Sequence, residues 1–250
     1  MSHATGGHAH AHHAATGKGK GKEVWLAATW PFVRDQLPPP PASVVELGCG
    51  PLGGHVPSLL QAGYQAIGID PEAPQQPATY HRIAFEEFHP DVAADAVIAS
   101  VSLHHTHDPG AALDHVADLL VPGGSLVVIE WISEDLDEPT AQWVFRHRPR
   151  GPEDPNDPDD PGSWLAQMRA DWTASGLPWD DYFRARFEEH GMHHAAVIRR
   201  ELEARFATVH LSTGPYYFSD LLDADEQTEQ AAIDSGEINP GCLRYAGRSA

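Results

Sequence analysis

The sequence around Glu46 limits the fold more than any other segment of the chain. An apolar run at residues 44–47 leads directly into the glycine turn Gly48-Cys49-Gly50, and a helical pattern follows at residues 56–62. Glycine lets the backbone turn sharply and approach a ligand that a Cβ atom would block. The order of strand, glycine turn and helix therefore predicts a βα unit with a nucleotide-like ligand on its turn.

The rest of the chain repeats this alternation of short β-branched runs with helical patterns, which is typical of βαβ units. The predicted strands are 44–47, 65–69, 81–84, 94–99, 125–131, 205–211 and 243–247, and the predicted helices are 23–37, 56–62, 111–120, 164–173, 180–190 and 194–203. Asp108, followed by Pro109, is the predicted N-cap of the third helix. We expect an α/β fold with a doubly wound, mostly parallel seven-stranded sheet and a helical insertion after the fifth strand.

Composition indicates which segments of the chain lie outside regular structure. Residues 1–22 are rich in His and Gly and have no hydrophobic period, so we expect a disordered His-rich tail before a single domain at 23–250. Proline and aspartate are so dense at 149–162 that a mobile loop is expected there. Two cysteines give no disulfide framework, and we expect a cytoplasmic protein with no metal site.

The charge of the chain limits its partners. Sixteen Lys and Arg stand against 36 Asp and Glu, a formal net charge of −20. Such a surface repels phosphate backbones and anionic lipid, so neither nucleic acid nor membrane is an expected partner. A small molecule is the expected partner, and the sequence does not specify the oligomeric state.

A second acid follows the second predicted strand. The run Ala66-Ile67-Gly68-Ile69 ends at Asp70. At the carboxyl end of a strand next to a glycine turn, a carboxylate can accept hydrogen bonds from both hydroxyls of a ribose.

Four blocks in order carry a resemblance to a known family. They are VVELGCGPLGG, IGID, DAVIASVSLHHTHDP and LLVPGGSLVVIEW, which lie within residues 43–131. The chain resembles the class I S-adenosylmethionine-dependent methyltransferases, in particular the small-molecule group that includes ubiquinone and menaquinone methyltransferase-like enzymes. The resemblance implies a Rossmann-like methyltransferase domain with S-adenosylmethionine as its cofactor.

The resemblance also assigns cofactor-binding positions. The glycine loop would lie against the methionine part of the cofactor, and the acid that ends the second strand would bind the ribose. The family commonly has an acid after the third strand for the adenine amino group; here that acid is either missing or displaced to Glu86, and adenine can instead lie against Phe85. The implied cofactor-binding residues are Glu46, Gly48, Cys49, Gly50, Asp70, Phe85, Glu86 and Ser100.

Two other functions remain open. Gly48, Gly50 and Gly53 also satisfy the loose G-x-G-x-x-G pattern of an NAD(P)-dependent oxidoreductase. Glu46 argues against it, because a carboxylate repels a pyrophosphate but attracts the ammonium group of S-adenosylmethionine. A non-catalytic cofactor-binding protein on the same fold is the second alternative.

Catalytic candidates come from the loop after the fourth strand. It contains three histidines, and His104 and His105 are the candidate general bases because an imidazole with a pKa of about 6.5 can deprotonate an acceptor near neutral pH. The alternative is a structural role in the loop. Tryptophans between Trp131 and Trp179 predict either a pocket roof or helix packing on the sheet.

Overall fold

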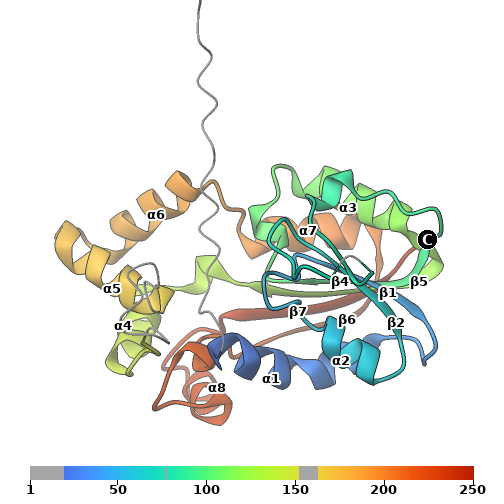
Figure 1. The fold of residues 1–250 in the computed structure, drawn as a ribbon. Helices are drawn as coiled ribbons and strands as arrows, with labels where there is room; N and C mark the ends of the chain where they lie inside the picture. The colour runs from blue at the N-terminus through green and yellow to red at the C-terminus, as the bar shows by residue number, and fades with distance from the viewer. Residues whose placement is uncertain (1–19, 77, 152–162) are drawn as a thin grey trace, which may run out of the picture.

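The protein is described by a computed structural model that covers residues 20–76, 78–151 and 163–250 (Figure 1). Its strands are β1 (Ser43–Leu47), β2 (Gln65–Ile69), β3 (Tyr80–His81), β4 (Ala94–Ser100), β5 (Leu120–Trp131), β6 (Ala207–Gly214) and β7 (Cys242–Arg248). They form one seven-stranded sheet in the order β3-β2-β1-β4-β5-β7-β6. Strands β1 to β5 are parallel, and β7 is antiparallel to both β5 and β6. The predicted doubly wound, mostly parallel sheet is confirmed.

Helices cover both faces of this sheet. Figure 1 shows α3 (Pro109–Leu119) and α7 (Ala195–Arg205) on one face, and α1 (Lys20–Gln36) and α2 (Val56–Gln61) on the other. Alternate residues of the central strands feed the two cores because successive side chains of a strand point to opposite faces. Val45 and Val97 pack with the α3/α7 side, whereas Val44 and Ile98 pack with the α1/α2 side.

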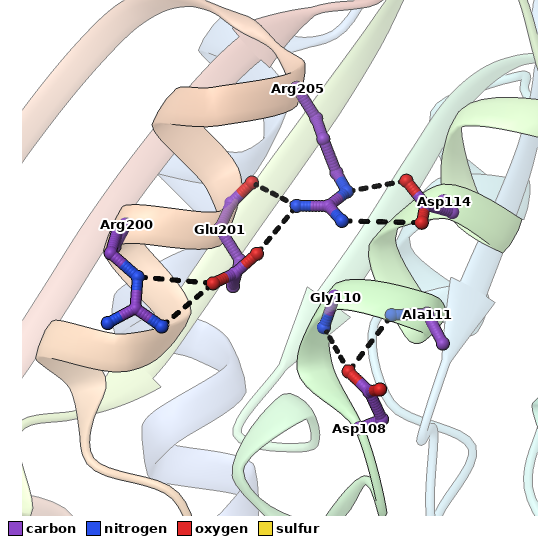
Figure 2. A network of polar contacts seen from close by, with 7 residues as sticks. All are labelled: Asp108, Gly110, Ala111, Asp114, Arg200, Glu201 and Arg205. Atoms are coloured by element: carbon purple, nitrogen blue, oxygen red, sulfur yellow. Dashed lines mark hydrogen bonds and ion pairs between the residues drawn. The ribbon is translucent and has the colours of Figure 1, made fainter.

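Polar contacts join α3 to α7 on the first face (Figure 2). The Arg205 guanidinium donates from Nε to Asp114 Oδ1 (2.6 Å) and from an Nη atom to Glu201 Oε2 (2.7 Å). Asp108 accepts from the backbone N–H of Gly110 at 2.9 Å, so the predicted N-cap of α3 is confirmed. The start of α3 directly follows the histidine loop, and these contacts hold its position over the sheet.

The predicted helical insertion after the fifth strand is also present. It comprises α4 (Glu138–Arg146), α5 (Trp164–Ser175) and α6 (Trp179–His190), which lie beyond one end of the sheet in Figure 1. An additional helix, α8 (Glu226–Asp234), lies between β6 and β7 in sequence. Among the helices of the described residues, none is both long and apolar enough to cross a membrane.

Several element boundaries differ from the prediction. Helix α1 begins at Lys20, so residues 20–22 are helical rather than part of the tail; Gly21 packs closely against the carbonyl oxygen of Ser219. Strand β5 begins at Leu120 because Leu120 still pairs with Ala94. The next pair is Ala96 with Ser125, so the extra residues of this register shift, which include the Pro-Gly-Gly segment, lie on β5. Residues 1–19 and 152–162, on which most of the predicted tail and mobile loop fall, lie outside the described residues.

Candidate functional site

The glycine turn has one glycine that packs against protein and one that faces open space. Gly48 and Gly50 have φ values of 72° and 65°, a region that favours glycine. A Cβ atom at Gly48 would lie 2.3 Å from the Ser102 Cβ, whereas no described atom lies within 4 Å of a Cβ built at Gly50. Gly48 therefore lets the turn pack on the loop after β4, and Gly50 leaves room for a ligand.

Glu46 lies behind this turn, and only 1% of the residue is exposed. Its Oε2 atom accepts hydrogen bonds from the backbone N–H groups of His55 (2.7 Å) and Val56 (3.1 Å). The Nδ1 atom of His55 lies 3.2 Å from Glu46 Oε1. Glu46 thus caps the start of α2 and fixes the shape of the turn.

Asp70 joins the turn to the end of β2. Its carboxylate accepts from the Gly50 N–H (2.9 Å) and from the Glu72 N–H (2.7 Å), and the side chain is half-buried. Cys49, between the two glycines, is buried, and burial, with the nearby Glu46 and Asp70, holds the pKa of its thiol well above the usual range. Cys49 is therefore a neutral packing residue.

The remaining predicted cofactor-binding residues are Ser100, Phe85 and Glu86. Ser100 ends β4, is 3% exposed, and its Oγ atom has no hydrogen-bond partner among the described residues. Phe85 begins the 3-10 helix η1 (Phe85–Glu87), where its ring packs 6.0 Å from that of His115. Glu86 is exposed.

The two catalytic candidates differ sharply in environment. His104 lies in the 3-10 helix η2 (Leu103–His105) and is buried, with its Nδ1 atom 2.5 Å from Glu130 Oε1. His105 is exposed, and its ring centroid lies 3.9 Å from that of His104. The segment between α6 and α7 contacts this loop, because the backbone N–H of His193 donates a hydrogen bond to the His104 carbonyl at 3.0 Å.

Glu130 is a residue that the sequence prediction missed. It is fully buried in β5 and accepts from the backbone N–H groups of Leu103 (3.1 Å) and Trp131 (2.9 Å). Burial raises the pKa of this carboxyl, but the opposing effect of His104 prevails and holds it below the usual value. An acid inside the apolar run before Trp131 is the signal that could have identified it.

Beside His104, aromatic side chains from distant segments meet. This aromatic cluster consists of Trp25, Trp131, Trp164, Phe183 and Tyr216. Tyr216 stacks on Trp131 with ring centroids 6.1 Å apart, and Trp131 contacts Trp164 at 5.5 Å and Phe183 at 6.0 Å. The Trp131 ring also lies 6.5 Å from that of His104. Trp143, Trp172 and Trp179 lie in α4, α5 and α6 and pack in the same hydrophobic core as Trp131 and Trp164. Packing of the tryptophans is thus present, and the pocket roof stays a prediction.

Two charged residues of the site were also not predicted. Asp220 accepts from the Trp164 indole N–H at 3.0 Å, and burial raises the pKa of its carboxyl. Lys22 of α1 interacts electrostatically with Glu46, Asp220 and Asp70; burial lowers the pKa of its ammonium although these acids raise it. Neither residue stands in a recognisable motif, because the chain brings them together only through tertiary packing.

Sequence comparison gives a family for this arrangement. A family model described as a methyltransferase domain matches residues 26–207. A curated relative, the ubiquinone biosynthesis O-methyltransferase of Bradyrhizobium sp. (strain ORS 278), is 31% identical over 127 residues. That match covers 44% of this chain and 50% of the relative, so the chain spans about half the length of the curated relative it matches.

Solved structures show the same fold. An S-adenosylmethionine dependent methyltransferase from Mesorhizobium loti matches with a TM-score of 0.53 and 20% identity over 89% of this chain and 99% of its own. A protein from Pyrococcus horikoshii matches with a TM-score of 0.54 and 10% identity over 91% of both chains. Together with the family match over 26–207, they confirm the predicted family: the chain belongs to the class I S-adenosylmethionine-dependent methyltransferases.

Proposed function

We propose that this protein transfers a methyl group from S-adenosylmethionine to a small-molecule acceptor. The observation that carries the proposal is the open space at Gly50, bordered by the half-buried Asp70 carboxylate at the end of β2. Asp70 would hold the ribose hydroxyls, and the turn from Gly48 to Gly50 would lie against the methionine part. The unpartnered, buried Ser100 Oγ offers a further polar group at the same sheet edge.

The acceptor would bind beside the aromatic cluster. When bound, S-adenosylmethionine supplies an electrophilic methyl group, so the protein has to align the acceptor and, where the acceptor carries a proton, remove it. Aromatic faces of Trp131, Trp164 and Tyr216 suit a flat or apolar small molecule. The net charge of −20 disfavours nucleic acid as the acceptor.

His104 is the proposed general base, with His105 as the second candidate. A buried carboxylate at Nδ1 fixes the ring orientation and stabilises the imidazolium that forms when the ring takes a proton. Glu130 supplies that carboxylate and is itself held by two backbone N–H groups. Because the curated relative is a ubiquinone biosynthesis O-methyltransferase, hydroxylated aromatic compounds are the first acceptors to test.

Calorimetric titration tests the cofactor assignment. The protein is expected to bind S-adenosylmethionine and S-adenosylhomocysteine and not NAD. Replacement of Asp70 by Ala should weaken S-adenosylhomocysteine binding by about 1–3 kcal/mol, since the ribose loses a charged acceptor. Asp118→Ala, which removes an exposed acid of α3, is the matched control and should bind normally.

Two results would contradict this proposal. Binding of NAD with no response to S-adenosylhomocysteine would support an oxidoreductase. Cofactor binding without methyl transfer to any member of a panel of phenols, carboxylic acids and amines would support a non-catalytic binding protein.

A further inference from the structure

A buried chain of hydrogen bonds runs from the glycine turn to helix α1. Glu46, His55 and Thr29 have exposed fractions of 1%, 1% and 0%. The Nδ1 atom of His55 lies 3.2 Å from Glu46 Oε1, and its Nε2 atom lies 3.1 Å from the Thr29 hydroxyl oxygen. His55 therefore contacts an acid of β1 through one ring nitrogen and a hydroxyl of α1 through the other.

The number of protons available to these hydrogen bonds determines the protonation state of the Glu46–His55 pair. The Thr29 hydroxyl has a single proton, and it donates that proton to the Trp25 carbonyl oxygen at 2.8 Å. The 3.1 Å contact with His55 is then a hydrogen bond only if Nε2 bears a proton and donates it to Thr29. Because the Glu46–Nδ1 contact needs a proton of its own, the Glu46–His55 pair holds one proton more than an ionised Glu with a neutral His.

Burial favours the same state. A carboxylate with 1% exposure is costly without compensation, and the additional proton makes the Glu46–His55 pair neutral overall. Lys22 of α1 also interacts electrostatically with Glu46, as do the titratable groups of Cys49 and Tyr80. The Trp30 ring packs on His55 with centroids 6.3 Å apart. The side-chain hydrogen bonds and the ring contact of His55 thus come from β1 and α1.

We propose that His55 is a positioning residue of the cofactor turn, which bears protons on both ring nitrogens or shares one with Glu46, and which with Thr29 ties α1 to that turn. The link has a direct consequence for the site, since α1 also contributes Lys22 and Trp25. Loosening Thr29 should disturb the turn without removing any group that touches the cofactor. This last step rests on the proposed cofactor binding, whereas the protonation state does not.

Nitrogen-15 NMR of the cofactor-free protein at pH 7 tests the protonation state directly. Histidine side-chain spectra should show a proton on Nε2 of His55, hydrogen-bonded to Thr29, and a second proton between Nδ1 and Glu46; the His55→Gln spectrum assigns the signals. Thr29→Val should release the Nε2 proton, and Thr29→Ser should restore it. A bare Nε2 atom in the wild-type protein would overturn the proposal, whatever the protein binds.

Affinity for S-adenosylhomocysteine tests the coupling. Thr29→Val should weaken binding about three- to tenfold, as expected for one hydrogen bond, and Thr29→Ser should bind like the wild type. Thr173→Val is the matched control, because Thr173, an exposed residue of α5, makes the same type of bond to the carbonyl four residues earlier (Arg169, 2.8 Å). Equal affinity of Thr29→Val and wild type would refute the coupling, whereas no binding by the wild type would refute the proposed function and leave the NMR result as the deciding measurement.

Discussion

Glu46 and Glu130 are two buried carboxylates with the same kind of hydrogen-bond partners, and their strands, β1 and β5, lie on either side of β4. Each stands one residue before the end of its strand, β1 or β5, and each accepts hydrogen bonds from two backbone N–H groups. Each also meets the Nδ1 atom of a buried histidine. A buried carboxylate with three donors is fixed in position, so each pair can orient a loop at the site.

The Glu130–His104 pair gives a prediction for catalysis. His104→Ala should lower the single-turnover rate of methyl transfer by about 10²–10⁴-fold, because a general base is lost, with cofactor affinity nearly unchanged. Glu130→Gln should lower the rate by a smaller factor, since the ring keeps a partner but loses the negative charge. The measurement uses labelled S-adenosylmethionine and a panel of phenols over a range of pH.

His107→Ala is the control, because His107 is an exposed residue of the same loop. A purely structural role for the pair makes a different prediction. Both variants would then unfold at lower temperature or bind the cofactor more weakly, and the pH dependence of the chemical step would not change.

At the scale of elements, the glycines between β1 and α2 have different roles: Gly54 is required for packing, and Gly50 is required for the proposed cofactor binding. Gly50→Ala introduces only the strain of a left-handed residue, about 1–2 kcal/mol, but places a Cβ in the space assigned to the cofactor. Gly54→Ala adds a clash, because its Cβ would lie 2.3 Å from Glu46 Oε1. We expect Gly54→Ala to cost about 1–3 kcal/mol more in unfolding free energy, and Gly50→Ala to lose more cofactor affinity relative to its stability.

Urea denaturation and calorimetry on the two variants measure both quantities. Ala at Gly123 provides a control for strain alone, since its φ is 76°, no described atom lies within 4 Å of the added Cβ, and it stands far from the turn in sequence. If Gly50→Ala bound S-adenosylhomocysteine as well as Gly123→Ala does, the open space at Gly50 would not be the cofactor site.

The elements that could be predicted are those whose signal is local. Strand β2 has the predicted bounds, and α3 has the predicted cap, because a β-branched run between polar residues and an Asp-Pro pair can both be identified from neighbouring residues. Helices α4 and α8 were missed. Each is only nine residues long, and a helix this short depends for its stability on tertiary contacts such as those of Trp143 and Ala232.

The same rule holds for the site: residues in a local motif could be predicted, and residues brought in by tertiary packing could not. Gly50 and Asp70 stand in a motif of strand, turn and strand, and the structure brings them to one place. Lys22 and Asp220 have no such local pattern, and Lys22 meets the predicted residues only after α1 has packed on the sheet. The apolar run around Glu130 marks it as a buried acid, but its partner His104 follows only from the pairing of β4 with β5. Long-range packing, rather than residue type, determines their environment.

At the scale of the whole molecule, the net charge of −20 and the buried acids both make the stability of the fold depend on pH. Glu229 of α8 is fully buried and accepts backbone N–H groups of Tyr216 (2.7 Å) and Phe218 (2.7 Å), so it holds the segment that carries the aromatic cluster's Tyr216. Burial raises the pKa of Glu229 to about 7, although these hydrogen bonds lower it. The carboxyl therefore binds its proton more tightly in the folded than in the unfolded protein.

The sign of the pH effect follows from that difference. An unfolded Glu has a pKa of about 4.3, so the stabilisation by the Glu229 proton is fully present below that pH and is lost as pH rises toward 7. The wild-type free energy of unfolding should fall between pH 5 and pH 8 relative to that of Glu229→Gln, by up to about 3 kcal/mol. Urea denaturation at unit steps of pH measures it, with Glu189→Gln, an exposed acid of α6, as the control. Because the other titrating groups are common to both proteins, parallel curves for wild type and Glu229→Gln would show that Glu229 is ionised throughout. Its three backbone donors, the N–H groups of Tyr216, Tyr217 and Phe218, would then outweigh the effect of burial.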